Sequence, residues 1–324
     1  MKEISAKLVK QLRDKTGAGM MECKKALEES GGDLEKAAIV LRKRGLAGAT
    51  KKEGRSTKQG LIASHIGAEG KSGVLVEVNC ESDFVARTED FQTLAADIAA
   101  HIAQTKPKVV RVEDITEAER ANLKAHEALY EQQFTKDRNT TIAELVKSKI
   151  AKLGENINVS RFELYDLNGT GVVGSYVHTG AQIGVLLEVQ APEQVTGKDE
   201  FKTLVHDVAM QITAAHPQCV SRDNVPSDLL QKEREIQRER ARGEGKPEKM
   251  LDKIVEGRMG KFYEEVCLLD QPFIRENTIT VGELIRTAAG KLGGDIGVAR
   301  FVRYKVGDAG DAPGVQESPL PVTA

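Results

Sequence analysis

The side chains best suited to contact another molecule lie in one short segment, made of Ser82, Asp83, Phe84 and Val85. An apolar run at residues 73–78 predicts a buried strand before this segment, and a helical pattern begins near Glu89 after it. An acidic and an aromatic side chain are therefore placed side by side where a strand turns into a helix. Connections of this kind lie on the surface and often carry function, so we expect the segment to take part in recognition.

A second copy of the surrounding pattern follows later in the chain and lacks this acid and aromatic. Three blocks recur in the same order: residues 60–78 match 171–189, residues 91–110 match 201–220, and residues 144–162 match 283–301. The alignment sets Asp83 against Gln194 and Phe84 against Val195. Two interpretations of Phe84 remain open. It packs in the core beside a turn capped by Ser82 or Asp83, or it projects from the surface as an apolar wedge.

Other motifs that could carry chemistry are weaker. Gly70-Lys71-Ser72 matches the end of a phosphate-binding loop, but His65 stands where the first glycine is required, and a strand pattern follows. The anion site of such a loop needs the N-terminus of a helix. The six histidines have no spacing typical of metal ligands, and no GxSxG sequence is present. We therefore predict no catalytic residue and no metal site.

Composition narrows the class of protein. The chain of 324 residues carries 47 positive and 49 negative side chains, so no net field draws it to nucleic acid or to an anionic membrane. Aromatic residues make up 4% and tryptophan is absent, which disfavours a surface for stacking bases. There is no apolar signal core near the N-terminus and no apolar run of about 20 residues, and the four cysteines form no CxxC pair. These features predict a cytoplasmic protein with reduced thiols.

The pattern of apolar and turn residues in the rest of the chain describes the units that position the segment from Ser82 to Val85. It predicts the α+β fold class. In chain order these units are a three-helix N-terminal domain (1–46), a solvated linker (47–59), a first core subdomain (60–166), a second core subdomain (167–306) and a disordered tail (307–324). Asp33 is the predicted N-cap of the third helix, and Gly45 is its predicted end. The N-terminal domain is so small that we expect it to use outward apolar groups for docking.

Each core subdomain is predicted as a strand, a hairpin and a second strand, followed by helices and a closing strand. This order gives a small antiparallel sheet covered on one face by helices. The second subdomain carries an insertion at residues 226–268, in which two helical patterns are separated by Gly243-Glu244-Gly245. We expect a protruding antiparallel helical hairpin there.

Several segments resemble signatures of the translation elongation factor Ts family. Residues 8–27, which contain Thr-Gly-Ala-Gly-Met-Met-Glu-Cys, and residues 77–86, Glu-Val-Asn-Cys-Glu-Ser-Asp-Phe-Val-Ala, are similar to its two signature sequences. Residues 245–247, 254–259 and 271–273 resemble its coiled-coil insert and the exit from it. The resemblance covers nearly the whole chain. It implies a UBA-like N-terminal domain and a guanine-nucleotide exchange factor, with no enzymatic chemistry and no cofactor of its own.

The resemblance also implies roles for the first segment. Ser82, Asp83, Phe84 and Val85 match a family segment, Thr-Asp-Phe-Val, that contacts the partner GTPase near its nucleotide site and is associated with the loss of Mg²⁺. Serine in place of threonine keeps the hydroxyl group, so capping should be preserved. The C-terminal helix of many relatives has no counterpart in the pattern after Tyr304.

Five further residues are implied to contact the partner. Leu12, Met20 and Met21 match the docking surface of the N-terminal domain. His178 and Gly180 lie in or beside a Ser-Tyr-x-His stretch of the second subdomain, whose neighbourhood faces another domain of the GTPase.

The function implied by the resemblance is to bind the GTPase elongation factor Tu in its GDP form, to displace Mg²⁺ and GDP, and to stabilise the nucleotide-free state until GTP binds. We expect the chain itself to bind no nucleotide, no nucleic acid and no membrane. Two other functions stay open from the residues alone. One is a nucleotide-binding enzyme that uses Gly70-Lys71-Ser72, and the other is a nucleic-acid-binding protein that uses the basic residues of the linker.

Overall fold

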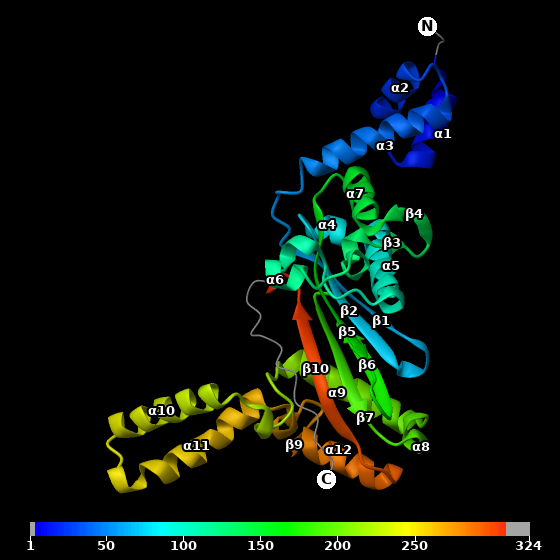
Figure 1. The fold of residues 1–324 in the computed structure, drawn as a ribbon. Helices are drawn as coiled ribbons and strands as arrows, with labels where there is room; N and C mark the ends of the chain where they lie inside the picture. Colours follow the sequence, from blue (N-terminus) through cyan, green and yellow to red (C-terminus); the bar gives the residue numbers. More distant parts are fainter. Residues whose placement is uncertain (1–3, 309–324) are drawn as a thin grey trace.

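In the computed structural model, which describes residues 4–308, the chain begins with three helices around a small apolar core (Figure 1). These are α1 (Ala6–Thr16), α2 (Met20–Glu29) and α3 (Leu34–Thr50). Their apolar faces meet at Leu12, Cys23 and Leu27, which are fully buried. The Asp33 carboxylate accepts hydrogen bonds from two backbone N–H groups in the first turn of α3, so the predicted N-cap is confirmed.

The end that we predicted for α3, at Gly45, is wrong because the helix continues to Thr50. Gly45 instead allows α3 to approach α7 (Ile142–Leu153) closely, since a Cβ atom on Gly45 would lie 2.8 Å from the Cβ atom of Ala151. The last turn of α3 also buries Ala49 in the core of the first subdomain. The first residues of the predicted linker are therefore helical and packed.

The first core subdomain is an antiparallel sheet with the strand order β1–β2–β5. Its elements are β1 (Gln59–Ile66), β2 (Ser72–Cys80), α4 (Asp83–Ala86), α5 (Glu89–Thr105), α6 (Glu117–Arg120), β3 (Gln133–Phe134), β4 (Asp137–Thr141), α7 and β5 (Ile157–Asp166). Nearly every residue of β2 is buried, because α5 packs on one side of this central strand and the second subdomain on the other (Figure 1).

The second core subdomain repeats this architecture with the strand order β10–β7–β6. Its elements are β6 (Gly171–Val177), β7 (Ile183–Gln190), α8 (Glu193–Thr196), α9 (Asp199–Ala215), α10 (Ser227–Gly243), α11 (Leu251–Val266), β8 (Pro272–Phe273), β9 (Glu276–Thr280), α12 (Val281–Leu292) and β10 (Gly297–Lys305). Here α9 and α12 occupy the places of α5 and α7. The predicted α+β fold class and the duplicated sheets are confirmed.

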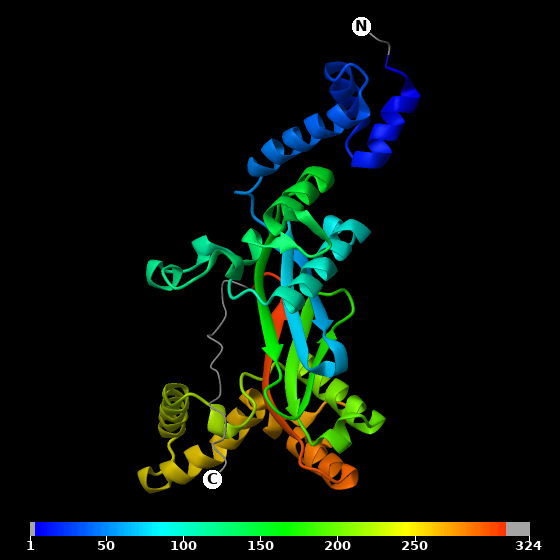
Figure 2. The same ribbon diagram turned by 45° about the vertical axis from the view of Figure 1, so that its right-hand side comes forward.

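The inserted helices α10 and α11 form an antiparallel hairpin that projects away from the sheets (Figures 1 and 2). Apolar residues recur at helical spacing along the buried side of α11: Leu251, Val255, Met259, Phe262 and Val266. Exposed ion pairs such as Arg234–Glu256 also join the two helices. Because exposed pairs contribute little individually, the apolar contacts account for most of the stability of the hairpin.

The two sheets face each other across a shared core (Figure 2). The guanidinium group of Arg161 lies over the ring of Tyr304, and that of Arg300 lies over Tyr165, with 4.1 Å to the ring centre in both cases. Each copy thus supplies the cation that covers the tyrosine of the other copy, and the two subdomains form one unit.

The chain after β10 returns to the first subdomain. Gly307, the first residue of the predicted tail, donates its backbone N–H to the carboxylate of Glu77 at 2.8 Å. Residues 309–324, on which most of the prediction of a disordered tail falls, lie outside the described residues.

Candidate partner-binding site

The single helical turn α4 presents Phe84 to solvent. The Ser82 hydroxyl accepts a hydrogen bond from the N–H of Val85 at 3.4 Å and so caps this turn. Ala86 is buried and Val85 packs against the first core, whereas the side chain of Phe84 is 80% exposed. The interpretation in which Phe84 packs in the core is therefore wrong, although the Ser82 cap that it included is confirmed. The ring projects from the surface instead. A short helix can bury only one of its sides, and Phe84 lies on the other.

Asp83, the first residue of α4, is also accessible. Its side chain is half exposed, and its carboxylate accepts a hydrogen bond from the Arg87 guanidinium at 2.9 Å. Arg87 is exposed too, so water screens this ion pair and it contributes little to stability. The pair can therefore be exchanged for contacts with another molecule at small cost.

The turn that leads into α4 is held by a carboxylate from the turn that follows α7. Glu155 accepts hydrogen bonds from the backbone N–H of Ser82 at 2.9 Å and from its hydroxyl at 2.5 Å. In return, the Glu81 carboxylate accepts a hydrogen bond from the backbone N–H of Asn156 at 2.7 Å. Burial, with a smaller contribution from the charge of Glu155, raises the pKa of the Cys80 thiol to about 12. The thiol stays protonated and donates to the Ser82 carbonyl at 3.1 Å.

The second copy has no aromatic residue at the position of Phe84. Because α4 and α8 are each a turn of 4 residues, their residues correspond in order, so Phe84 corresponds to Gln194 and Val85 to Val195. The alignment that set Phe84 against Val195 is therefore wrong by one position. Val195 is fully buried and Gln194 is exposed, as expected for the inward and outward positions of the same turn.

Two of the three residues predicted for N-terminal docking are accessible. At the start of α2, Met20 is 44% exposed and Met21 is 65% exposed. Leu12, by contrast, is fully buried in the core of the three helices, so in this fold it does not lie on the surface that another protein can reach. Its packing holds α1 against α2 and thereby stabilises the helix that carries the two methionines.

Direct contacts through α7 link the N-terminal unit to the α4 region. The loop after α1 passes close to α7, since a Cβ atom on Gly17 would lie 2.9 Å from Cε of Lys152. Lys152 and Lys149 form ion pairs with Asp90 in the first turn of α5, at 2.7 and 2.9 Å. The hydrogen bond from Lys152 and, to a smaller extent, the one from Lys149 lower the pKa of Asp90. The loop between α1 and α2 is thus joined through α7 to the first turn of α5, the helix that follows α4 in the chain.

His178 and Gly180 lie in the exposed turn between β6 and β7. The Nδ1 atom of His178 shares a hydrogen bond with the hydroxyl of Tyr176 at 3.1 Å, which holds the imidazole ring. The same turn reaches the first subdomain, because the N–H of Ile62 in β1 donates to the carbonyl of Ala181 at 2.7 Å. Since β1 pairs with β2, which leads into α4, this turn lies against the sheet that presents Phe84.

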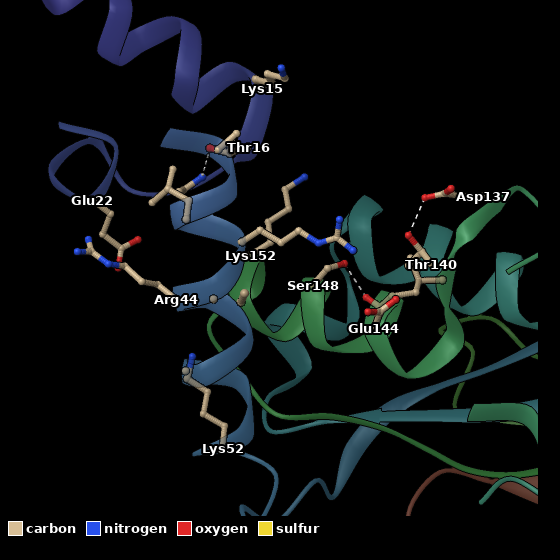
Figure 3. A pocket seen from close by; sticks show the side chains of 18 of the residues that line it. Lys15, Thr16, Glu22, Arg44, Lys52, Asp137, Thr140, Glu144, Ser148 and Lys152 are labelled. Atoms are coloured by element: carbon tan, nitrogen blue, oxygen red, sulfur yellow. Dashed lines mark hydrogen bonds between the residues drawn. The ribbon is translucent and has the colours of Figure 1, made fainter. Parts of the chain in front are cut away.

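A cleft of about 690 Å³ lies between the N-terminal unit and α7 (Figure 3). Lys15 and Thr16 from α1 line one side, and Glu144, Ser148 and Lys152 from α7 line the other. The lining contains none of the residues predicted for partner binding. Phe84, Met20, Met21, His178 and Gly180 lie instead on open surface, which suits recognition of a protein better than enclosure of a small molecule.

The described residues give little support to one alternative left open by the sequence, the nucleotide-binding enzyme. Within residues 4–308, no group of three or more His, Cys, Asp or Glu side chains could hold a metal ion. Gly70-Lys71-Ser72 lies in the hairpin connection between β1 and β2 and leads into a strand, so the helix N-terminus that a phosphate-binding loop needs is missing there. None of the helices described is long and apolar enough to span a membrane.

Comparison with known proteins agrees with the signature segments. Residues 81–308 match the family model described as elongation factor TS. A protein named Elongation factor Ts from Aquifex aeolicus is 44% identical over 304 residues, which cover 94% of this chain and 98% of that protein. The proteins of the same name from Clostridium acetobutylicum and Prosthecochloris aestuarii are each 42% identical, over 94% and 95% of this chain and 93% and 100% of their own lengths. The chain belongs to the elongation factor Ts family.

Membership of the elongation factor Ts family confirms the resemblance and supports a role in nucleotide exchange on elongation factor Tu. The elongation factor Ts signatures identified α4 but gave no sign of Glu155 and Asn156, which hold the turn before it. Comparison of the two copies could have indicated Glu155, because the second copy has Gly294 at the corresponding position. A difference of the same kind between the copies drew attention to Phe84.

Proposed function

We propose that this protein is a guanine-nucleotide exchange factor for the GTPase elongation factor Tu in the cytoplasm. It binds the GDP form of the GTPase, displaces Mg²⁺ and GDP, and stabilises the nucleotide-free state until GTP binds. The observation that carries this proposal is the aromatic ring of Phe84, 80% exposed on a capped helical turn beside the half-exposed Asp83. Covering such a ring with a partner is favourable because its apolar surface leaves water.

In the proposed mechanism, the segment from Ser82 to Val85 acts at the nucleotide site of the GTPase. GTPases of this type hold GDP through backbone donors, a lysine and Mg²⁺. The ring of Phe84 inserts beside this site, and Asp83 contacts groups near the Mg²⁺ ion. Ser82 caps the turn and Val85 anchors it in the core, so the two outward side chains are held ready before the partner binds.

Exchange follows from linkage between two binding equilibria. If the factor weakens nucleotide binding by some ratio, nucleotide weakens binding of the factor by the same ratio. No bond is made or broken, so no catalytic residue or cofactor is needed, and the cellular excess of GTP over GDP sets the direction.

One phenylalanine cannot supply the whole difference in affinity. A shift of about 10⁴-fold needs about 5.5 kcal/mol of differential binding, whereas burial of one phenylalanine contributes about 2–3 kcal/mol. We therefore assign the remainder to Met20 and Met21 on the N-terminal unit and to the turn of His178 and Gly180 in the second subdomain. Leu12 contributes only by supporting the methionines.

The test follows release of a fluorescent GDP from elongation factor Tu after addition of this protein and excess unlabelled GDP. We expect the release rate to rise with the concentration of the protein and to reach a plateau. An unchanged lifetime of the bound nucleotide at every concentration contradicts the proposal. As a control, the protein alone should retain no labelled GDP or ATP in equilibrium dialysis, and retention would favour the nucleotide-binding enzyme.

A further inference from the structure

The carboxylate of Glu155 controls the cap of the turn that carries Phe84. The Ser82 hydroxyl donates to Glu155 at 2.5 Å and accepts from the N–H of Val85 at 3.4 Å. Because a hydroxyl has one proton, a strong acceptor such as Glu155 fixes where that proton points and leaves a lone pair free for Val85. The second carboxylate oxygen holds the backbone N–H of Ser82 at 2.9 Å. One side chain thus fixes both polar groups of the capping residue.

The α4 turn depends on such external anchors. A helix of 4 residues is far below the length at which a helix is stable by itself. At its C-terminal end, Val85 and Ala86 are anchored in the apolar core. At its N-terminal end the anchor is Ser82, held by Glu155. Phe84, with most of its surface in water, adds no anchor of its own.

The turn at residues 154–156 also holds the chain that comes from the N-terminal unit. The buried side chain of Asn156 donates to the backbone carbonyls of Glu53 and Arg55 at 3.1 and 2.8 Å. The ammonium group of Lys52 donates to the carbonyl of Gly154 at 2.8 Å. The connection from α3 and the connection into α4 are therefore fixed to the same three residues.

The second copy provides a natural comparison. Gly294 corresponds to Glu155, and Pro192 corresponds to Ser82 and makes no side-chain hydrogen bond to α8. A Cβ atom on Gly294 would lie only 2.9 Å from Cγ of Pro192, so this turn is closed by direct apolar packing. The copy without the exposed aromatic ring is also the copy without the carboxylate.

We propose that Glu155 is a positioning residue for nucleotide exchange. It holds Ser82, and through Ser82 the α4 turn, in the orientation in which Phe84 enters the GTPase. Its effect passes through Phe84 and does not require contact between Glu155 and the GTPase. This inference rests on the proposed function.

The test compares the full-length protein with the variants Glu155→Ala, Glu155→Gln, Phe84→Ala and the double variant of Glu155→Ala with Phe84→Ala. Release of fluorescent GDP from elongation factor Tu is measured over a range of protein concentrations. We expect Glu155→Ala to lower the plateau rate about tenfold, which corresponds to about 1.4 kcal/mol, the size of a lost hydrogen bond to a charged group. The half-saturating concentration should change less than about threefold, since the docking surfaces are untouched.

Two results separate positioning from a general loss of structure. Glu155→Gln keeps one oxygen that can accept from the Ser82 N–H, so it should recover about half of the lost activity on a logarithmic scale. The double variant should have the same plateau rate as Phe84→Ala alone. Asp295→Ala, which removes an exposed carboxylate from the corresponding turn of the second copy, should release GDP at the unaltered rate. Thermal unfolding shows whether each variant is folded. If Glu155→Ala does not fold, the comparison is made with Glu155→Gln.

The outcomes that overturn the inference differ from those that overturn the proposed function. If Phe84→Ala is slow but Glu155→Ala and Glu155→Gln match the unaltered protein, Glu155 has no positioning role. The same holds if Glu155→Ala still costs about tenfold in the Phe84→Ala background, because it then acts independently of the ring. If the unaltered protein does not accelerate GDP release at all, the proposed function fails and the inference falls with it.

Discussion

The two core subdomains share a fold and its buried interactions, yet they differ where the first turn after the hairpin meets solvent. Both copies bury a phenylalanine at the same place, Phe91 in one and Phe201 in the other. At the outward position of the short turn, however, the first copy has Phe84 and the second has Gln194. The fold therefore does not require an aromatic ring at this position. A difference between copies that packing does not explain is a sign of a contact outside the chain.

A second difference concerns what covers the last helix of each copy. In the first copy α7 meets α3, with Ala151 against Gly45. The corresponding residue of α12 is Gly290, and a Cβ atom there would meet nothing within 4 Å among the described residues. Among the described residues, the N-terminal unit thus packs against the copy that presents Phe84, which places two of the three candidate contact surfaces, α4 and the start of α2, on one part of the molecule.

The largest expected effect tests the interactions that the copies share. Arg161 pairs with Glu77, whose side chain is 0% exposed, and Arg300 pairs with Glu188 in the same way. Arg161→Met leaves a buried carboxylate without its cation, so we expect the free energy of unfolding to fall by about 3–5 kcal/mol. Arg300 is more exposed than Arg161, 38% against 18%, and Arg300→Met should cost about 2 kcal/mol because water already screens that pair. Urea unfolding measures both, and equal losses would contradict this difference between the copies.

The next effect tests the position at which the copies differ. Phe84→Gln, which gives the first copy the residue of the second, should slow GDP release from elongation factor Tu about 10- to 100-fold through lost burial at the interface. Its thermal stability should hardly change because the ring is mostly in water. Gln194→Phe is the matched control and should leave the release rate unaltered. A normal rate for Phe84→Gln removes the ring from the mechanism.

A smaller effect is expected from the N-terminal unit that only the first copy carries. Met20 and Met21 are partly exposed, so replacing both by alanine should weaken the complex with elongation factor Tu about tenfold by removing apolar area from the contact. The plateau rate of GDP release should remain, since α4 is unchanged. Titration of the release rate against protein concentration separates the two quantities. Ile39→Ala, an exposed apolar residue on α3, is the control, and an equal loss in that variant would argue against a specific methionine contact.

The smallest expected effect concerns a buried pair of polar side chains whose residue types differ between the two copies. His101 shares a hydrogen bond with Gln132 at 2.9 Å, whereas Gln211 donates to Gln271 at 3.1 Å in the second copy. Burial lowers the pKa of His101 below its usual value, although the hydrogen bond with Gln132 acts in the opposite direction. The stability linked to this group is therefore present above about pH 6.5 and is lost as the pH falls through the lower pKa of the folded state.

We expect His101→Gln to remove that part of the acid sensitivity. Near pH 7.5 the variant should differ by less than about 1 kcal/mol, because a neutral hydrogen-bonded pair replaces another. Below about pH 6 its free energy of unfolding should decline less steeply, by at most about 1.4 kcal/mol per pH unit. Urea unfolding at a series of pH values gives both numbers. An identical slope in the two proteins would show that the pKa of His101 is the same in the folded and the unfolded state.

Much of the fold could be predicted from local patterns. The strand at residues 73–78, the helix that begins at Glu89, the Asp33 cap and the helical hairpin are each encoded by neighbouring residues, and the structure has all four. The predictions were wrong where a residue typical of one local structure serves a contact between distant parts of the chain. Gly45 is typical of a helix end, but it serves close packing of two helices.

The candidate site was predicted only in part for the same reason. Periodicity identifies the apolar face of a helix but does not say which element will cover it, so the burial of Leu12 and the exposure of Phe84 could not be separated by sequence alone. Glu155 lies 73 residues from Ser82 along the chain, and no local pattern predicts that hydrogen bond. Likewise, the thiols of Cys219 and Cys267, 48 residues apart in sequence, come within 3.6 Å in the fold.

By itself the sequence determined the elements, their duplication and the segment most suited to recognition, because propensity, capping and periodicity act between neighbours within a few residues. Only the tertiary structure decided which side of the α4 turn faces water, which carboxylate holds its cap, and which copy carries the N-terminal helices. Those outcomes depend on how faces from distant parts of the chain pack together, and burial and hydrogen bonding are set by that packing as a whole.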